Sequence, residues 1–210
     1  MTETIGYDDL VRMIRSAAQM IRDQHEVLSR LDSAVGDGDH GTTMLRAMES
    51  AENAIGALSS RDLKSLLNDV GWAILGIDGG ATGPLFGSLF MGMAEAVGED
   101  SLDAKALAAV FEAGLAAVQR QTKAQVGDKT MIDALVPGVQ ALRASADGGE
   151  GIAAAMQQAA LSAETGAAST KALRARFGRA RNLGDRSIGA QDAGATSVSL
   201  IFRGFAEAGA

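Results

Sequence analysis

Apolar residues recur along this 210-residue chain at intervals of three and four, which is the spacing of one buried face of an α-helix. Seven segments show this period: Tyr7–Arg30, Met44–Leu58, Leu63–Ile74, Leu85–Val97, Leu107–Val118, Ile132–Leu142 and an alanine-rich run from about Gly151 to Thr165. The pattern therefore predicts seven helices before the C-terminal region.

The last apolar segment is ambiguous. Val198, Ile201, Phe202 and Phe205 have helical spacing, but the stretch TSVSLIF is also typical of a strand. No other segment alternates as a strand does. We therefore expect an all-α fold of about eight helices that forms a single domain over residues 1–210.

Local signals predict several helix ends. Ser59 or Ser60 is expected to cap the third helix, and Ser101 or Asp103 to start the fifth. Pro137 is expected to kink the sixth helix, because proline removes a backbone donor. The stretch from Ala144 to Gly151 is the only flexible-looking connector.

Glycine-rich polar loops interrupt the helices at Gly36–Gly41, Gly76–Gly83, Gly127–Thr130 and Gly178–Gly194. In an up-and-down array every second loop lies at the same end. The first three loops follow the first, third and fifth predicted helices, so they are expected to meet at one end. This convergence points to a site.

Composition and net charge argue against several classes of function and of site. A net charge of −7 argues against a nucleic-acid partner, and the absence of cysteine excludes disulfides and thiolate metal sites. No apolar run reaches the roughly 18 residues of a membrane span, and the N-terminus has no apolar signal core. We expect a cytoplasmic chain with no membrane partner.

The stretch LDSAVGDGDHG, Leu31–Gly41, carries three aspartates among three glycines. It matches G-x-G-x-x-G, but a helix precedes it and its aspartates would repel a dinucleotide phosphate. No P-loop motif occurs in the chain. An EF-hand is rejected because Thr42 and Met48 stand where that motif needs glycine and glutamate.

A magnesium site fits this loop better. Asp32, Asp37 and Asp39 are hard oxygen donors, and three carboxylates could hold two ions with room left for phosphate oxygens. Free N–H groups at Gly41, Thr42 and Thr43, at the start of the next helix, could bind an anion directly. The alternative is that Asp32 caps a helix end and GDGD is a solvated turn. His40 either holds the loop's shape or contacts the ligand.

The other loops are weaker signals. The small residues of DGGATGP let a ligand approach the backbone, or they form a tight turn. Thr130 and Met131 are expected at a helix start, with Met131 either in the core or in contact with ligand. Arg179, Arg181 and Arg186, next to Asp192, either complement a polyphosphate or form a solvated basic loop.

Four blocks of the sequence together resemble a known family. LDSAVGDGDHGTTM, GGATGPLFG, GDKTMIDAL and GRARNLGDRSIGAQDAGATS are similar, in this order, to the blocks of the dihydroxyacetone kinase L subunit (DhaL) family. The resemblance covers nearly the whole chain. It implies an eight-helix antiparallel barrel with ADP or ATP held at one rim through two Mg²⁺ ions.

The resemblance also implies roles for individual residues. The metal ligands would be Asp32, Asp37 and Asp39. The nucleotide-binding residues would be His40, Gly41, Thr42, Thr43, Ala81, Thr82, Gly83, Thr130, Met131, Arg179 and Asp192. The chain departs from the family where Ala81-Thr82 replaces a usual serine pair, where GRARN replaces GRASY and where DAGA replaces DPGA. These departures leave open a different small ketose, such as a four-carbon one.

The leading hypothesis is phosphoryl transfer, with charge neutralisation and positioning as the source of catalysis. By resemblance, the ketone is bound by a separate K subunit, and the donor is either ATP or a phosphotransferase-system protein that recharges bound ADP. Two alternatives remain: a regulatory nucleotide-binding module that binds transcription regulators, and a stand-alone metal-dependent phosphohydrolase. Homo-oligomerisation stays open.

Overall fold

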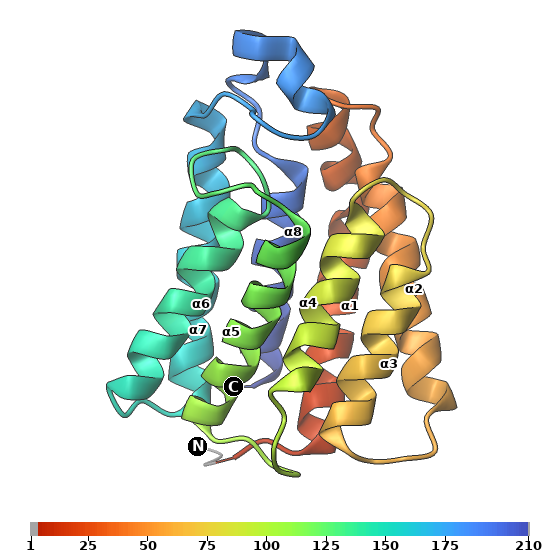
Figure 1. Cartoon of the computed structure of the whole chain (residues 1–210), viewed down its shortest axis with the longest axis vertical. Coiled ribbons are helices and arrows are strands. Elements are labelled where there is room, and N and C mark those ends of the chain that lie inside the picture. Colours follow the sequence, from red (N-terminus) through yellow and green to blue (C-terminus); the bar gives the residue numbers. More distant parts are fainter. Residues whose placement is uncertain (1–3, 210) are drawn as a thin grey trace.

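The computed structural model describes residues 4–209, which contain eight α-helices and two short 3₁₀ helices (Figure 1). The α-helices are α1 (Tyr7–Ser33), α2 (His40–Ala57), α3 (Leu63–Leu75), α4 (Thr82–Glu95), α5 (Ala104–Gln121), α6 (Ile132–Asp147), α7 (Ile152–Ser169) and α8 (Ala193–Ala208). The 3₁₀ helices η1 (Thr170–Ala172) and η2 (Arg179–Ser187) lie between α7 and α8. The described residues form no strand, which confirms the all-α prediction.

The helices run up and down and close into a ring. Each helix packs against the next in sequence, and α8 packs against α1 (Figure 1). Because neighbours are antiparallel, the loops after α1, α3, α5 and α7 lie at the same end, with η2 across it. The first described residues and the end of α8 lie at the opposite end. The predicted convergence of loops is thus confirmed.

Small residues let the helices of the ring approach closely. A Cβ atom on Gly204 in α8 would lie only 2.5 Å from the backbone nitrogen of Ala17 in α1. Aromatic rings fill the centre: Phe111 of α5 lies 5.2 Å from Phe202 and 5.7 Å from Phe205, measured between ring centroids. Three of the eight aromatic residues of the chain thus pack together between α5 and α8.

Several predicted helix ends need correction. The stretch TSVSLIF is helical, as part of α8. Asp62, and not Ser59 or Ser60, caps α3 by accepting a hydrogen bond from the backbone N–H of Ser65. The first half of the expected connector, residues 144–147, belongs to α6, which continues to Asp147.

Two other predictions of helix structure are confirmed. Asp103 caps α5, since its carboxylate accepts the backbone N–H of Ala106. Pro137 lies inside α6, as expected, and the kink at this position stays a prediction.

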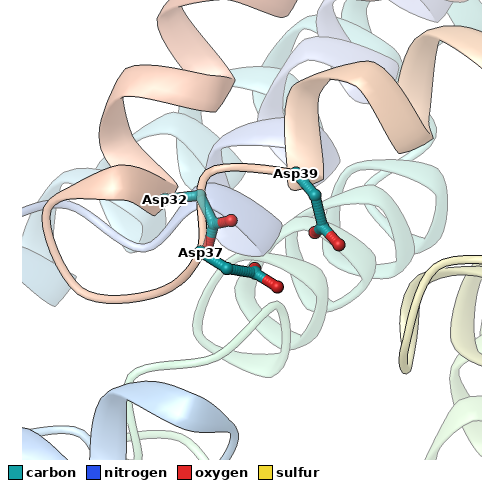
Figure 2. Close-up of side chains that lie close together, drawn as sticks. All are labelled: Asp32, Asp37 and Asp39. Carbon is teal, nitrogen blue, oxygen red and sulfur yellow. The ribbon is translucent and has the colours of Figure 1, made fainter.

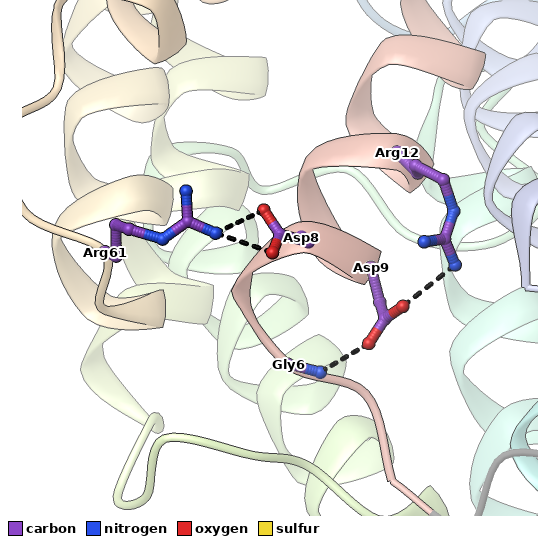
Figure 3. A network of polar contacts seen from close by, with 5 residues as sticks. All are labelled: Gly6, Asp8, Asp9, Arg12 and Arg61. Carbon is purple, nitrogen blue, oxygen red and sulfur yellow. Dashed lines mark hydrogen bonds and ion pairs between the residues drawn. The ribbon is translucent and has the colours of Figure 1, made fainter.

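Ion pairs and a hydrogen bond stabilise the end of the bundle opposite to the glycine-rich loops. Asp9 accepts the backbone N–H of Gly6 at 2.8 Å and pairs with Arg12, while Arg61 pairs with Asp8 (Figure 3). These contacts fix the start of α1. Within residues 4–209, no helix is both long enough and apolar enough to cross a membrane.

Candidate functional site

The three aspartates of the first loop lie close together. Asp32 is in the last turn of α1, Asp37 is in the loop, and Asp39 immediately precedes α2 (Figure 2). One carboxylate oxygen from each lies within 4.8 Å of the others. Burial and the nearby charge of Asp37 raise the pKa of Asp39, and Arg179 partly offsets this. The loop thus holds a concentrated negative charge that a divalent cation would relieve.

Asp32 also has a structural contact. Its carboxylate accepts the backbone N–H of His40, at the start of α2, at 3.3 Å. A carboxylate at a helix N-terminus is favoured by the helix dipole. The expected alternative role of Asp32 at a helix end is therefore present together with the cluster.

A cavity of about 340 Å³ opens beside the cluster, and all four glycine-rich loops line it. Asp32 and Asp39 form part of one wall, Gly79–Thr82 a second, Lys129–Ile132 a third and Phe177–Ala180 a fourth. Residues far apart in the sequence thus meet around a single hollow because the ring places their loops at one end.

Nine of the residues that the sequence analysis singled out line this cavity. They are Asp32, Asp39, His40, Ala81, Thr82, Thr130, Met131, Arg179 and Asp192. Asp37 lies beside the cavity as a member of the carboxylate cluster. Gly41, Thr42, Thr43 and Gly83 do not line it, and neither do Arg181 and Arg186.

Gly41 and Gly83 serve the packing of helices. A Cβ atom on Gly41 would lie 1.9 Å from the carbonyl oxygen of His25, so only glycine lets α2 start so close to α1. A Cβ atom on Gly83 would lie 2.8 Å from the carbonyl oxygen of Ile77, near the start of the preceding loop. Both positions are close backbone approaches.

Thr43 is buried, and its Oγ1 has no hydrogen-bond partner among the described residues. It lies behind Gly79, where an added Cβ atom would stand 2.7 Å from that oxygen. Leaving a buried hydroxyl unpaired costs about 1–3 kcal/mol. A direct contact between Thr43 and a ligand phosphate would require the Gly79 loop to move aside, whereas Thr42 is exposed.

His40 joins three helices at the cavity wall. Its Nε2 lies 2.8 Å from Ser197 Oγ in α8, and its Nδ1 lies 3.3 Å from Thr82 Oγ1 in α4. Burial lowers its pKa, an effect partly opposed by Asp32. The neutral ring is therefore held in one orientation, and His40 both shapes the loop and lines the cavity.

Asp192 and Met131 lie where a helix meets the cavity. Asp192 caps α8 by accepting the backbone N–H of Ala195 at 2.7 Å, and burial raises its pKa to about 6. Met131 directly precedes α6, as predicted, and is almost fully buried while also lining the cavity. The two readings of Met131, core residue and cavity residue, are thus compatible.

We call residues 171–189 the cap segment. They include η2, which lies across the loop end of the ring (Figure 1). Arg179 of this segment reaches the acidic loop with two contacts to Asp37, at 3.1 Å from Nη1 to Oδ1 and 3.0 Å from Nη2 to Oδ2. The cap segment thus bridges to the carboxylate cluster through a bidentate ion pair.

Three residues of the site were not singled out from the sequence. Lys129 lines the cavity, Ser197 orients His40, and Asp133 accepts the backbone N–H groups of Gly127 and Thr130. A capping-box spacing, Thr130 followed three residues later by Asp133, is the signal that could have found the last one. Ser197 carries no such signal, because it lies on an apolar helix face distant in sequence.

Comparisons with known proteins agree with this architecture. Residues 34–207 match the model of the DAK2 domain. The fold is thus that of an all-α domain found in kinases of small ketoses. The chain belongs to the DAK2 family, which contains the DhaL subunits of dihydroxyacetone kinases.

Individual relatives place the chain within this family. It is 38% identical, over 95% of this chain and 96% of the relative, to the ADP-binding subunit DhaL of the PEP-dependent dihydroxyacetone kinase of Escherichia coli. It is 36% identical to the corresponding subunit of kinase 1 of Listeria innocua, over 95% of each chain. It is also 35% identical to a D-erythrulose kinase of Mycolicibacterium smegmatis, over 94% of this chain but only 35% of that one. The relatives are named as kinases, so the family is one of phosphotransferases.

A solved structure shows the same fold. The dihydroxyacetone kinase of C. freundii, determined in complex with AMP-PNP and Mg²⁺, superposes with a TM-score of 0.72 at 25% identity. The match covers 93% of this chain and 33% of that one, so this chain spans about a third of the single-chain kinase.

Proposed function

We propose that this chain is the nucleotide-binding subunit of a kinase that phosphorylates dihydroxyacetone or a related small ketose bound on a separate K subunit. One observation carries the proposal: the carboxylates of Asp32, Asp37 and Asp39 converge beside a four-loop cavity in a member of the DAK2 family. The match along almost the whole length of relatives named ADP-binding subunits supports it. On this proposal residues 1–210 act as one domain.

The donor set fits Mg²⁺. All three ligand candidates are carboxylates, and Mg²⁺ is held by few carboxylates and shared with substrate phosphates. We propose two ions, held by Asp32, Asp37 and Asp39, with ADP or ATP. Bound Mg²⁺ would supply positive charge to the phosphate oxygens during transfer.

The remaining residues bind and orient the nucleotide. His40 and Thr82 present fixed polar atoms beside the carboxylates, and Arg179 supplies a cation from the cap segment. In the first turn of α2, the backbone N–H groups of Gly41 and Thr42 are proposed to face the phosphates. The N–H of Thr43, which the sequence analysis expected to be free, already donates to the carbonyl oxygen of Asp39 at 2.9 Å.

The base of the nucleotide is proposed to lie against the walls formed by the other loops. These walls include Ala81, Thr130, Met131 and Asp192. Gly83 does not line the cavity, and its proposed contribution is to let the start of α4, next to Thr82, pack closely on the preceding loop. The buried thioether of Met131 suits an adenine face, because it is soft and polarisable.

The proposal also concerns the phosphoryl donor and the phosphoryl acceptor. Relatives named PEP-dependent and PTS-dependent favour a phosphotransferase-system protein that recharges bound ADP, with ATP as the other donor. Relatives named erythrulose kinases keep a four-carbon ketose open as acceptor. The chain has no nucleophile in this scheme, so its role is positioning and charge stabilisation.

Native mass spectrometry with ADP and Mg²⁺ tests the proposal. We expect a nucleotide- and magnesium-bound chain, whose ADP affinity falls about a hundredfold or more in Asp37→Asn while the helical circular dichroism is unchanged. Asp78→Asn, at the same end but outside the cavity lining, is the matched control and should bind normally. A wild-type chain that binds no nucleotide at millimolar Mg²⁺ would contradict the proposal.

A further inference from the structure

Lys129 is an unusual lysine. It is 2% exposed, and it is the only non-glycine residue in the described part of the chain with a positive φ, at 62°. The left-handed region is unfavourable for a residue with a side chain, and burial of an ammonium group is costly. Tertiary contacts must therefore hold this residue in place.

The contacts of Lys129 join two distant points of the chain. Its Nζ donates to the carbonyl oxygen of Thr170 at 2.6 Å and to the carbonyl oxygen of Ala190. These two residues flank the cap segment on either side. Thr170 is also the C-cap of α7, where the helix dipole favours a cation. One ammonium group thus fastens both ends of the cap segment to the loop between α5 and α6.

Acidic side chains near the ammonium group of Lys129 favour its positive charge. The charges of Asp192 and Asp133 support the ammonium, and they partly offset the burial that lowers the pKa of Lys129. Two further bonds close the same seam: the N–H of Asp192 donates to Thr170 Oγ1 at 2.9 Å, and the N–H of Gly189 donates to the carbonyl oxygen of Lys171 at 2.8 Å. The base of the cap segment is therefore a built junction.

The junction lies next to the cavity. Lys129 lines it, and so do Phe177–Ala180, which the cap segment carries across its mouth. We propose that Lys129 is a positioning residue: it bonds to both ends of the cap segment, a role that we call a staple, and so fixes the position of the outer wall of the nucleotide cavity. This inference rests on the proposed function for the identity of the ligand. It assigns Lys129 an indirect role through Thr170 and Ala190.

The alternative role for Lys129 is a direct contact with a ligand phosphate, as would be expected of a lysine in a polyphosphate site. The geometry favours the staple, because two of the three donors of the ammonium group are already directed to backbone carbonyls. The two roles differ in two measurable ways. A staple affects the cap segment without any nucleotide present, whereas a phosphate contact affects only ligands that reach it.

Trypsin cleavage at arginines of the cap segment can measure how often the segment opens. Arg174, Arg176, Arg179, Arg181 and Arg186 are exposed, so trypsin can report on how often the segment opens. The test variant is Lys129→Met, which keeps the length of the side chain and removes the donors. Lys129→Gly is the second variant, since glycine accepts the positive φ and should fold if methionine does not. Lys123→Met, an exposed lysine of the same loop, is the matched control.

We expect cleavage after the cap arginines, in nucleotide-free protein, to rise tenfold or more in both Lys129 variants and to stay unchanged in Lys123→Met. Affinities for ADP and for AMP, with Mg²⁺, should both fall by about ten- to a hundredfold. Loss of ADP affinity alone, with cleavage unchanged, would overturn the staple in favour of a phosphate contact. Unchanged cleavage and unchanged affinities would overturn it as well. If the wild type binds neither nucleotide, the proposed function fails, while the cleavage ratio still decides the staple.

Discussion

At the scale of single residues, Asp192 shows how the fold changes the chemistry of a carboxyl group. Burial raises its pKa from 3.8 to about 6, although the N–H of Ala195 and the charge of Lys129 oppose the shift. Between these two pH values the folded chain keeps a proton that the unfolded chain has lost. This group therefore stabilises the fold less and less as the pH rises from about 4 to 6.

Asp192→Asn should remove this contribution to the pH dependence. Asparagine can still cap α8, but it carries no buried charge. Relative to wild type, the variant should be nearly unchanged at pH 4 and gain at most about 3 kcal/mol by pH 7, because one pKa unit corresponds to about 1.4 kcal/mol. Urea unfolding at several pH values measures the difference.

The exposed cap of α5 provides the control for this prediction. Asp103 makes the same kind of contact, with the N–H of Ala106 at 2.7 Å, but it lies in solvent. Asp103→Asn therefore removes no buried charge, and it is the matched control for the substitution of a helix-capping aspartate by asparagine. A difference between wild type and Asp192→Asn that stays constant from pH 4 to 7 would show that Asp192 is ionised throughout in the folded chain.

The sequence locates some residues of the site better than others. The three aspartates and the loops around them could be predicted, because acidic residues among glycines are visible locally. Lys129 could not be predicted, because no sequence pattern around it indicates its positive φ or its bonds to Thr170 and Ala190. His40 was recognised, but its orientation depends on Ser197, which is 157 positions away.

At the scale of elements, the cap segment would compete with the proposed metal ion for a carboxylate of the acidic loop. Arg179 holds Asp37 through a bidentate ion pair, with side chains 62% and 43% exposed. Exposed pairs add at most about 1 kcal/mol to stability. A cation near the cluster does, however, oppose the approach of a second cation.

Arg179→Gln should therefore free Asp37 for the metal. In the absence of nucleotide, we expect Mn²⁺, used as a spectroscopic substitute for Mg²⁺, to bind about three- to tenfold more tightly, with little change in melting temperature. Electron paramagnetic resonance of free Mn²⁺ measures the affinity. Arg61→Gln, which breaks the Arg61–Asp8 pair at the far end (Figure 3), should leave it unchanged. Weaker Mn²⁺ binding in Arg179→Gln would show instead that Arg179 preorganises Asp37.

Helical periodicity predicted the existence of the eight α-helices but not the structure between α7 and α8. The buried faces of α1 to α7 repeat at helical spacing, so they are readable from the chain. The cap segment has no such face, and it is held by contacts with residues distant in the sequence, such as the hydrogen bond from the N–H of Arg176 to the carbonyl oxygen of Asp128. Helix ends were less accurate, because Asp62 and the serines before it compete as caps for α3.

At the scale of the whole molecule, the site exists because the ring closes. The contact between α8 and α1 brings Ser197 and Asp192 to the loops that follow α1, α3 and α5. Gly204 is a point of close approach between α8 and α1, since a Cβ atom added there would lie 2.5 Å from the backbone of Ala17. The stability of this seam should therefore control the whole fold.

Gly204→Ala should destabilise the chain although alanine is the better helix former. Overpacking of a tight contact costs about 1–3 kcal/mol, which exceeds the roughly 0.5–1 kcal/mol gained from helix propensity. Gly56→Ala in α2 is the matched control, because nothing lies within 4 Å of its added Cβ atom. It should stabilise the chain by up to about 1 kcal/mol. Urea unfolding of both variants gives opposite signs if the α1–α8 seam is as tight as the structure shows, and a stabilised Gly204→Ala would mean that α8 can shift away from α1 at little cost.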